Sequence, residues 1–399
     1  MADSEATINI EPRQRTVVSL FSGLGGLDLG FLWEGFKIIW ANDVSQHATE
    51  THKLNFGGET VCGDIDQIPT SEIPDSDVIV GGPPCQSFSL VGQRQRDDAR
   101  GRLVFRFLEI VKAKRPIAFV MENVPGMAAS RIGERRLPDV LQESFLELGY
   151  HVTRLNLTAT DYLVPQRRKR LLLVGCLGAR PEAVDGTRFA RECYGVDSCS
   201  FDVSARAAIG DLGPCTQKGK RAVYREDEPS QFASLMRSAN LPDVSLHEKP
   251  RMSKTDELLV SHIPPGGNYM NIPDEIAPGR VLKFKESGGR TTTYGRLHPD
   301  KPSYTINTYF RRPNVGCNFH YSEPRLITPR EAMRFQSIPD HFELCFGSQD
   351  QRNALIGNAV PPLMARAVAW DLRRALERAE LHAEDPPLVA TLPAQPSFL

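Results

Sequence analysis

The sequence predicts an α/β fold in which helices cover both faces of a mostly parallel sheet and a smaller, loop-rich domain follows. Between residues 15 and 177, short apolar runs alternate with segments of helical periodicity, the pattern of parallel strands joined by crossover helices. That pattern is lost between residues 178 and 325, where Gly, Pro, Ser and charged residues interrupt short apolar pieces. A length of 399 residues is sufficient for two such units.

The composition is that of an ordinary soluble protein. Hydrophobic residues make up 40% of the chain and charged residues 24%, with 48 basic against 49 acidic residues and a net charge of −1. We find no uninterrupted apolar stretch of about 18 residues and no signal or transit peptide, so we expect a cytoplasmic protein without membrane contact. The charge balance excludes a histone-like polycation, but it allows a local basic groove that binds nucleic acid.

The eight cysteines are scattered, and none of them forms a CxxC pair. We therefore expect no zinc site, and without an export signal we expect no disulfide framework. Most of these thiols should be buried fillers of the core. They stand at positions 62, 85, 176, 193, 199, 215, 317 and 345.

Five apolar runs predict strands that end at residues able to carry chemistry. The residues at or just beyond these ends are Gly23, Asp43, Asp64, Cys85 and Glu122. Two further strands are expected within 150–162 and 170–177. Because ligands of parallel sheets bind beyond the carboxyl ends of the strands, the five residues indicate a common site.

Helices are expected between the strands and again near the C-terminus. Residues 102–115 have apolar side chains at helical spacing, and Pro116 ends that helix. In the segment 326–378, Thr328 is placed to cap a helix with Pro329 at its first position, and a turn then precedes a long amphipathic helix. The Pro-rich residues 379–399 predict a disordered tail.

The turn FSGLGGLD, residues 21–28, has three glycines between a strand and a helix. Glycines let the backbone approach a ligand closely, although Asp28 stands where the dinucleotide fingerprint has its last glycine. Asp43 is placed to accept both hydroxyls of a ribose, and Asp64 to accept from an adenine amino group, whereas each acid alone is more often a helix cap or a solvated strand end. Together they favour an adenosine-type nucleotide, and both NAD and S-adenosylmethionine contain adenosine.

The stretch VGGPPCQSFS places Cys85 directly after two glycines and two prolines. Pro83 and Pro84 fix two φ angles and remove two N–H donors, so the segment holds the thiol rigidly. An attacking thiolate needs local help, because the ordinary pKa of cysteine is about 8.5. The polar, arginine-containing loop that follows is suited to closing over an anion. The alternative interpretation is a buried cysteine before a surface loop.

A carboxyl and two guanidiniums complete the set of candidate residues. Glu122 ends a buried strand, where partial desolvation raises the pKa of a carboxyl toward the general-acid range. Arg168 and Arg170 stand two apart before a strand, and a period of two places both on one face. Two guanidiniums beside a thiol and a carboxyl suit a polyanionic or carbonyl-rich substrate. The alternative for Glu122 is a side chain that bonds only local backbone N–H groups. The alternative for the two arginines is a strand start exposed to solvent.

These blocks, in this order, resemble the DNA (cytosine-5)-methyltransferases of the bacterial restriction–modification type. The blocks are FSGLGG, the GD of residues 63–64, GGPPCQSFS, ENV, QRRKR, TPREAMRFQSIPD and IGNAVPP. The match runs from about Val17 to about Leu177 and from about Arg325 to Trp370, which is about half of the chain. The resemblance implies a Rossmann-like S-adenosylmethionine-dependent methyltransferase sheet at 15–177, a target-recognition domain at 178–325, and a segment at 326–378 that returns to the catalytic domain.

The resemblance also implies roles for single residues. Cys85 would be the nucleophile, Glu122 would hold the cytosine edge at N3 and N4, and Arg168 or Arg170 would contact the base. The residues that would surround S-adenosylmethionine are Phe21, Gly23, Asp43, Asp64, Pro84, Asn358 and Val360. The family often has Glu where this chain has Asp43, which gives a shorter reach to the ribose.

The chemistry explains why these groups occur together. Cytosine C5 is a poor nucleophile, and addition of the Cys85 sulfur to C6 would make C5 enamine-like and able to attack a methyl sulfonium. A proton from Glu122 at N3 and an arginine near O2 would stabilise the developing charge. The base must first leave the DNA stack by flipping. No metal is needed.

We expect a monomeric enzyme that acts on a specific sequence of double-stranded DNA. A cognate restriction endonuclease would act on the same site without forming a stable complex. Arg296, Arg311 and Arg312 are candidate base contacts, although phosphate binding or plain solvation suits each of them equally well.

Three other functions are compatible with parts of the sequence. An RNA cytosine-5 methyltransferase would use the same catalytic groups, but the long 178–325 region and the TPREAMRFQSIPD block favour duplex DNA. A catalytically inactive DNA-binding regulator would not need the intact thiol, carboxyl and arginines. An NAD oxidoreductase is disfavoured by the missing last glycine and by the block around Cys85.

Overall fold

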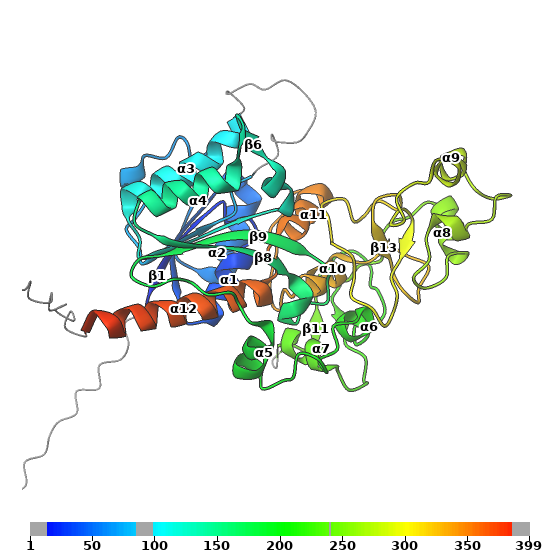
Figure 1. The fold of residues 1–399 in the computed structure, drawn as a ribbon. Coiled ribbons are helices and arrows are strands. Elements are labelled where there is room, and N and C mark those ends of the chain that lie inside the picture. The colour runs from blue at the N-terminus through cyan, green and yellow to red at the C-terminus, as the bar shows by residue number, and fades with distance from the viewer. Residues whose placement is uncertain (1–13, 85–98, 239–240, 385–399) are drawn as a thin grey trace, which may run out of the picture.

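The computed structural model describes residues 14–84, 99–238 and 241–384, and Figure 1 shows that they form two lobes. One lobe holds a seven-stranded sheet between layers of helices, so the predicted α/β class is confirmed. The other lobe is built of loops, short helices and very short strands, which agrees with the loss of periodicity in that part of the sequence. None of the helices in the described part of the chain combines the length and the hydropathy of a membrane span.

The sheet determines where the carboxyl ends of the strands lie. Its strands are β1 (Thr16–Leu20), β2 (Lys37–Asp43), β3 (Glu59–Cys62), β4 (Val78–Gly81), β5 (Ala118–Asn123), β8 (His151–Thr158) and β9 (Lys169–Cys176). They lie in the order β3-β2-β1-β4-β5-β9-β8, with the first five parallel and β9 antiparallel to both of its neighbours. The chain changes direction across the sheet between β1 and β4, and sheets of this kind bind ligands at that switch point.

Helices cover both faces of the sheet (Figure 1). They are α1 (Gly26–Trp33), α2 (Gln46–Phe56), α3 (Ala99–Lys114), α4 (Leu137–Glu147) and α12 (Pro362–Glu384). Apolar residues of α1, α2 and α12 pack with Val17 and Val120 on one face. Those of α3 and α4 pack around Phe119 on the other face. A hairpin of β6 (Arg131–Ile132) and β7 (Arg135–Arg136) precedes α4.

Two glycines let α12 pack closely on α1. A Cβ added to Gly26 would lie 2.1 Å from the Val360 carbonyl oxygen, and one added to Gly30 would lie 2.5 Å from the Cβ of Ala365. Any larger residue at either position would overlap the C-terminal segment. The chain therefore returns from the second lobe to the first helix of the sheet, directly behind the turn that follows β1.

The region between the sheet and the C-terminal helices has two parts, which pack into different hydrophobic clusters. Its first part contains α5 (Gly186–Tyr194), α6 (Ala205–Ile209), β10 (Ala222–Val223), α7 (Gln231–Met236) and β11 (Asp243–Val244), and it packs into the same core as the sheet. Its second part contains α8 (Lys254–Ser261), α9 (Gly279–Ser287), β12 (Gly295–Arg296) and β13 (Cys317–Phe319), and has a core of its own around Tyr294. Members of this second core lie between residues 259 and 326, and other residues of the same stretch, Leu297, Ile306, Phe310 and Cys317, pack into the core of the sheet lobe.

Helix α10 (Pro329–Phe335) begins as predicted, with Thr328 as its cap and Pro329 at its first position. The Thr328 side chain accepts from the N–H of Glu331, and the Glu331 carboxylate accepts from the N–H of Thr328. The fully buried Arg334 pairs with Asp340 at 2.5 Å and with Asp211 at 3.2 Å. These ion pairs fix α10 to the first part of the middle region.

The C-terminal helix is longer than the sequence predicts. Helix α11 (Gln349–Asn358) leads into α12, which continues to Glu384 and so passes the expected start of a disordered tail at residue 379. Glu380 pairs with Arg15 beside β1 at 2.7 Å, which gives this extension a contact with the sheet lobe. The remaining tail residues lie outside the described part of the chain.

Candidate active site

The turn after β1 is shaped to lie against a ligand. Phe21 and Gly23 both have a φ of +55°, the left-handed region, so the chain bends sharply at the switch point. A Cβ added to Gly23 would meet nothing within 4 Å, and the Ser22 Oγ is buried without a hydrogen-bond partner among the described residues. An open backbone and an unpaired buried hydroxyl at this position fit a bound cofactor.

Asp43 ends β2 and its carboxylate reaches back to this turn. Oδ2 accepts from the N–H of Gly23 and Oδ1 from the N–H of Ser45, each at 2.9 Å. Burial raises the pKa of Asp43, and the two backbone hydrogen bonds oppose that shift. The carboxylate therefore ties the turn to the start of α2 while it keeps lone pairs for the hydroxyls of a ligand.

The next residue, Val44, is a cofactor candidate that the sequence analysis did not identify. It is an apolar side chain that is 73% exposed at the carboxyl end of β2, beside the turn and the carboxylate just described. An exposed Val at the ligand edge of a sheet is suited to packing against a flat ring. Its exposure, which identifies it, depends on tertiary structure.

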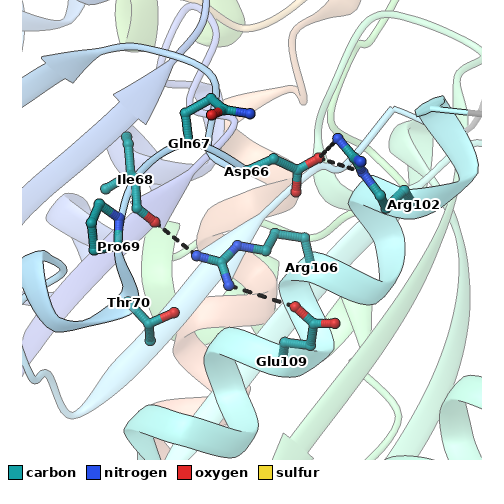
Figure 2. Close-up of a pocket in the computed structure, with 8 residues that line it drawn as sticks. All are labelled: Asp66, Gln67, Ile68, Pro69, Thr70, Arg102, Arg106 and Glu109. Carbon is teal, nitrogen blue, oxygen red and sulfur yellow. Dashed lines mark hydrogen bonds and ion pairs between the residues drawn. The ribbon is translucent and has the colours of Figure 1, made fainter.

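Asp64 is exposed on the loop after β3, and α3 holds that loop in place. Arg106 donates to the carbonyls of Ile65 at 3.3 Å and Ile68 at 2.8 Å, and Arg102 pairs with Asp66 at 2.6 Å. Figure 2 shows these side chains around a cavity of about 520 Å³ between the loop and α3. The residues of the loop that line this cavity begin at Asp66, while Asp64 itself is exposed to solvent.

The backbone before the candidate nucleophile is held by Asn123. Its Nδ2 donates to the carbonyl of Pro83 at 2.9 Å, and the side chain is buried. Pro84, the last described residue of this segment, is partly buried at the end of β4. Cys85 itself lies outside the described residues, as does the polar loop up to residue 98. No role was expected for Asn123 from the sequence, although it stands next to Glu122.

Glu122 and Arg170 form a buried ion pair at the carboxyl end of β5. Arg170 Nε lies 2.5 Å from Glu122 Oε1, and the two side chains are 8% and 11% exposed. The pair forms because β9 is antiparallel to β5, which brings the start of β9 beside the end of β5. Gly82 completes the arrangement, since a Cβ there would lie 2.8 Å from Glu122 Oε2. A larger residue at this position would force the Glu122 carboxyl to move.

Burial raises the pKa of Glu122, and the charge and hydrogen bond of Arg170 only partly oppose it. Burial likewise lowers the pKa of Arg170, with Glu122 opposing that shift. Both shifts have the same physical cause, because the surroundings disfavour the charged form of each group. A carboxyl in this state can hold a proton at a pH where an exposed glutamate has lost it.

Arg168 has different partners from Arg170. Its guanidinium is almost completely buried and donates to the carbonyls of Ile306 at 3.0 Å and Gly357 at 2.8 Å. The neighbouring Gln166 is also buried and donates to the carbonyl of Phe335. These contacts join the start of β9 to the second lobe and to α11, so the structure does not place Arg168 with the Glu122 carboxyl.

Asn358 and Val360 come from the returning C-terminal segment. Asn358 is exposed at the end of α11, and Val360 is 7% exposed with its carbonyl against Gly26. The segment therefore lies against the start of α1, the helix that follows the turn after β1. Of the expected cofactor residues, the structure places this segment, the β1 turn and Asp43 in one neighbourhood.

A second cavity, of about 350 Å³, lies where the second lobe meets the start of β9. Arg167 and Arg290 line it and, within the described residues, neither has an ion-pair partner. Arg167 also lies over the ring of the exposed Tyr304, 6.0 Å from its centroid. The other lining residues are Thr292, Thr293, Thr305, Asn307, Asn314, Val315 and Gly316. Uncompensated cations among hydroxyl and amide groups suit contact with a nucleic acid.

The arginines expected to contact bases have other environments. Arg296 is buried and donates to the carbonyls of Ile263 at 2.7 Å and His320 at 3.0 Å, so it is a structural residue. Arg311 forms two hydrogen bonds with Asp350, and Arg312 lies over the ring of Tyr309 on the surface. Sequence position alone did not distinguish the buried cation from exposed ones.

Comparison with known proteins agrees with this geometry. Residues 15–374 match the model of the C-5 cytosine-specific DNA methylase family. The chain belongs to this family. It is a DNA (cytosine-5-)-methyltransferase, and the resemblance seen in the sequence is confirmed. An NAD oxidoreductase is excluded by the same match.

Curated relatives cover the methyltransferase almost from end to end. The Type II methyltransferase M.NgoFVII of Neisseria gonorrhoeae is 32% identical, with 94% of this chain and 92% of that protein covered. M.MthTI of Methanothermobacter thermautotrophicus is also 32% identical, with 90% and 98% covered.

Solved structures show the same fold. A proposed DNA modification methyltransferase encoded within a prophage (E. coli) has a TM-score of 0.64 at 24% identity, with 91% of this chain and 100% of that chain covered. The S. pombe Dnmt2 methyltransferase has a TM-score of 0.56 at 16% identity, with 92% and 99% covered.

Proposed function

We propose that the enzyme transfers a methyl group from S-adenosylmethionine to C5 of a flipped-out cytosine within a specific double-stranded DNA sequence, through a covalent bond between Cys85 and C6. The observation that carries this proposal is the buried pair of Glu122 and Arg170 directly beside Gly82, at the segment that leads to Cys85. A neutral carboxyl and a guanidinium suit the N3–N4 edge and O2 of a cytosine.

The cofactor would lie over the turn after β1 and the carboxyl ends of the neighbouring strands. The backbone of Phe21 and Gly23 would approach it, the Asp43 carboxylate would accept from its ribose, and Asp64 would accept from its adenine. Pro84, Asn358 and Val360 would close the remaining sides. S-adenosylmethionine supplies an electrophilic methyl group when it is bound. The open backbone at Gly23 and the unpaired Ser22 hydroxyl support this placement.

Four residues of the chain would each have one role in the proposed reaction. The Cys85 sulfur would bond to C6 while Glu122 donates a proton to N3, which offsets the negative charge that develops on the ring. Arg170 would stabilise O2 electrostatically. Loss of the C5 proton and release of the sulfur would then restore the thiol. Asn123 would act by positioning, since it holds the Pro83 carbonyl.

Of the two arginines left open by the sequence, we assign the base contact to Arg170. Arg168 is already bonded to two main-chain carbonyls, and removing it from them would leave both unsatisfied in a buried place. Arg168 would therefore support the site by holding the second lobe to the sheet.

The cavity lined by Arg167 and Arg290 would face the DNA beside the flipped base. We further propose that the enzyme works as a cytoplasmic monomer and protects host DNA from a cognate restriction endonuclease that recognises the same site. The Type II methyltransferase relatives support this role. The part of the second lobe that packs around Tyr294 would supply most of the sequence recognition.

A mechanism-based substrate tests the central step. DNA that carries 5-fluorocytosine at the target should trap a covalent adduct, because fluorine at C5 cannot leave as the proton does. Mass spectrometry should find the adduct at Cys85. Cys85→Ser should bind the same DNA without forming an adduct, and Cys199→Ser, at an exposed thiol elsewhere, should behave as wild type. An active wild-type enzyme that forms no adduct would refute the covalent mechanism. Labelled-methyl transfer to matched RNA rather than DNA would identify an RNA enzyme.

A further inference from the structure

Within the described residues, one group outside the active site has the ligand types and spacing of a metal centre. The donor atoms of His47, Glu50 and Cys345 all lie within 4.8 Å of one another. His47 and Glu50 stand one turn apart on α2, and Cys345 lies on the segment before α11. Cys345 is 295 residues from Glu50 in sequence, so the CxxC spacing on which the expectation of no zinc site depended could not reveal this group.

The backbone around Cys345 is fixed to α2 without the help of an ion. The Thr51 hydroxyl accepts from the N–H of Cys345 at 2.9 Å and donates to its carbonyl at 3.3 Å. One turn later, Asn55 donates to the carbonyl of Glu343 at 2.8 Å and accepts from its N–H at 3.1 Å. These contacts hold the Cys345 thiol against the surface of α2. A binding site requires its ligands to be held in place in this way before the ion arrives.

The side chains converge on one point. Sγ of Cys345 lies 2.8 Å from Glu50 Oε2, and His47 Nδ1 lies 3.8 Å from the same oxygen. His47 Nδ1 is buried and has no hydrogen-bond partner, while the far side of the ring lies against Gly347. Tetrahedral zinc places such donors about 3.3–3.6 Å apart. Movements of less than about one ångström would therefore bring all three to ligating positions.

We propose that His47, Glu50 and Cys345 bind a divalent transition-metal ion, for which zinc is the best match. One sulfur, one imidazole and one carboxylate are ligands that zinc accepts, and the partial exposure of the His47 and Glu50 side chains, 24% and 39%, leaves room for a water as the fourth. The ion displaces the thiol proton to solvent, and the sulfur binds as the thiolate.

The ion would link two segments that lie next to the proposed cofactor site, and we call this link the clasp. Helix α2 starts directly after Asp43, and the segment with Cys345 leads into α11, which ends at Asn358. Joining them would reduce their independent motion. The proposal is separate from the methyl-transfer mechanism, because none of the three ligands belongs to that machinery.

Cobalt titration of the full-length enzyme tests the site, because a cobalt–thiolate bond has a near-ultraviolet charge-transfer band. We expect one ion per chain, loss of the band in Cys345→Ser, and an affinity lower by about 10-fold or more in His47→Ala. Cys85→Ser and Cys62→Ser should keep the band. A wild-type enzyme without the band, a band that survives Cys345→Ser, or a band lost only in Cys85→Ser would each overturn the proposal.

Thermal unfolding tests the clasp without reference to activity. Zinc should raise the Tm of the wild type and of Cys62→Ser, and it should leave the Tm of Cys345→Ser unchanged. Magnesium, which prefers oxygen ligands, should change none of them. An equal rise for Cys345→Ser and the wild type would show that zinc acts elsewhere and would refute the clasp.

Discussion

At the scale of single residues, the proposed reaction requires Glu122 to hold a proton in a buried place. The carboxyl and the Arg170 guanidinium lie 2.5 Å apart, yet burial is the largest influence on each pKa and disfavours both charges. Gly82 lets the chain pass against the carboxyl, and Asn123 holds that chain by a carbonyl. Arg170, Gly82 and Asn123 therefore together determine the surroundings of the Glu122 carboxyl.

Replacing Glu122 with Gln should slow methyl transfer far more than it weakens DNA binding. The amide keeps the shape of the side chain but cannot give a proton to N3, and a positioned general acid contributes about 10²–10⁴-fold. Single-turnover transfer of labelled methyl and fluorescence anisotropy with target DNA would measure the two effects. Glu72→Gln, at an exposed carboxyl, should change neither. Equal losses of rate and binding would contradict an acid role.

The pH dependence of the methyl-transfer step should show the same group. The folded pKa of Glu122 is raised, so the protonated, active form persists above the ordinary range and the rate falls as pH rises through the folded pKa. Arg170→Met should move this falling limb to higher pH, because Arg170 opposes the shift. Single-turnover rates measured across a pH range would check this prediction. A falling limb that Arg170→Met does not move would show that a group other than Glu122 causes it.

The linked effect on stability has a definite sign. Because the folded pKa of Glu122 lies above its unfolded value, the contribution of this group to stability is complete below the unfolded pKa. It is lost as pH rises through the folded pKa. At neutral pH, burial of the Glu122 carboxyl therefore lowers the free energy of unfolding, and the same burial favours its protonated form.

At the scale of elements, one antiparallel strand and one close helix pair build the site. β9 runs against β5, so the start of β9 meets the end of β5 and Arg170 reaches Glu122. A parallel β9 would place its first residues at the opposite edge of the sheet. The α1–α12 contact has a similar effect on the cofactor edge, since it brings Val360 against Gly26.

Gly30→Ala should destabilise the catalytic lobe by at least ~1–3 kcal/mol through overpacking. The added Cβ would lie 2.5 Å from both the Ala365 Cβ and the Arg366 nitrogen, and backbone cannot move aside cheaply. Urea unfolding of the pure protein would measure the change. Gly279→Ala is the matched control, since its Cβ would meet nothing within 4 Å and the variant should unfold as wild type. An unaltered midpoint for Gly30→Ala would mean that α12 packs less closely than described.

At the scale of the whole molecule, one cavity is lined by residues from both the start of β9 and the second lobe. Arg167 stands beside Arg168, which is bonded to Ile306 of the second lobe and to Gly357 before the cofactor segment. The cations that line the cavity are unpaired among the described residues, whereas the buried Arg296 supports the fold. DNA held here would contact both lobes.

Arg167→Ala and Arg290→Ala should each lower the slope of log affinity against log salt by about 1 if each contacts a phosphate. Binding of target DNA at several salt concentrations would measure this slope. Lys37→Ala is the control, because Lys37 is exposed at the start of β2, at the opposite edge of the sheet from the site. Slopes that match the control would exclude phosphate contacts in this cavity.

Part of the site was predictable because local chemistry determines it. The alternation of apolar runs placed Glu122 at a strand end, and Thr328 with Pro329 marked the start of α10. Helix α4 at 137–147 was not predicted. The contact of Asn123 with Pro83, the exposure of Val44 and the cavity beside Arg167 were also missed, because each depends on neighbours distant in sequence.

The amino-acid sequence alone determined the α/β class, the strand ends with their acids, and the family, because periodicity and contiguous motifs are local properties. Only tertiary structure decided which arginine meets the carboxyl, which cation is buried, and which distant side chains converge near Cys345. Those outcomes depend on strand direction and packing between remote segments, where burial changes the free energy of a charge and a glycine decides how closely two backbones can lie.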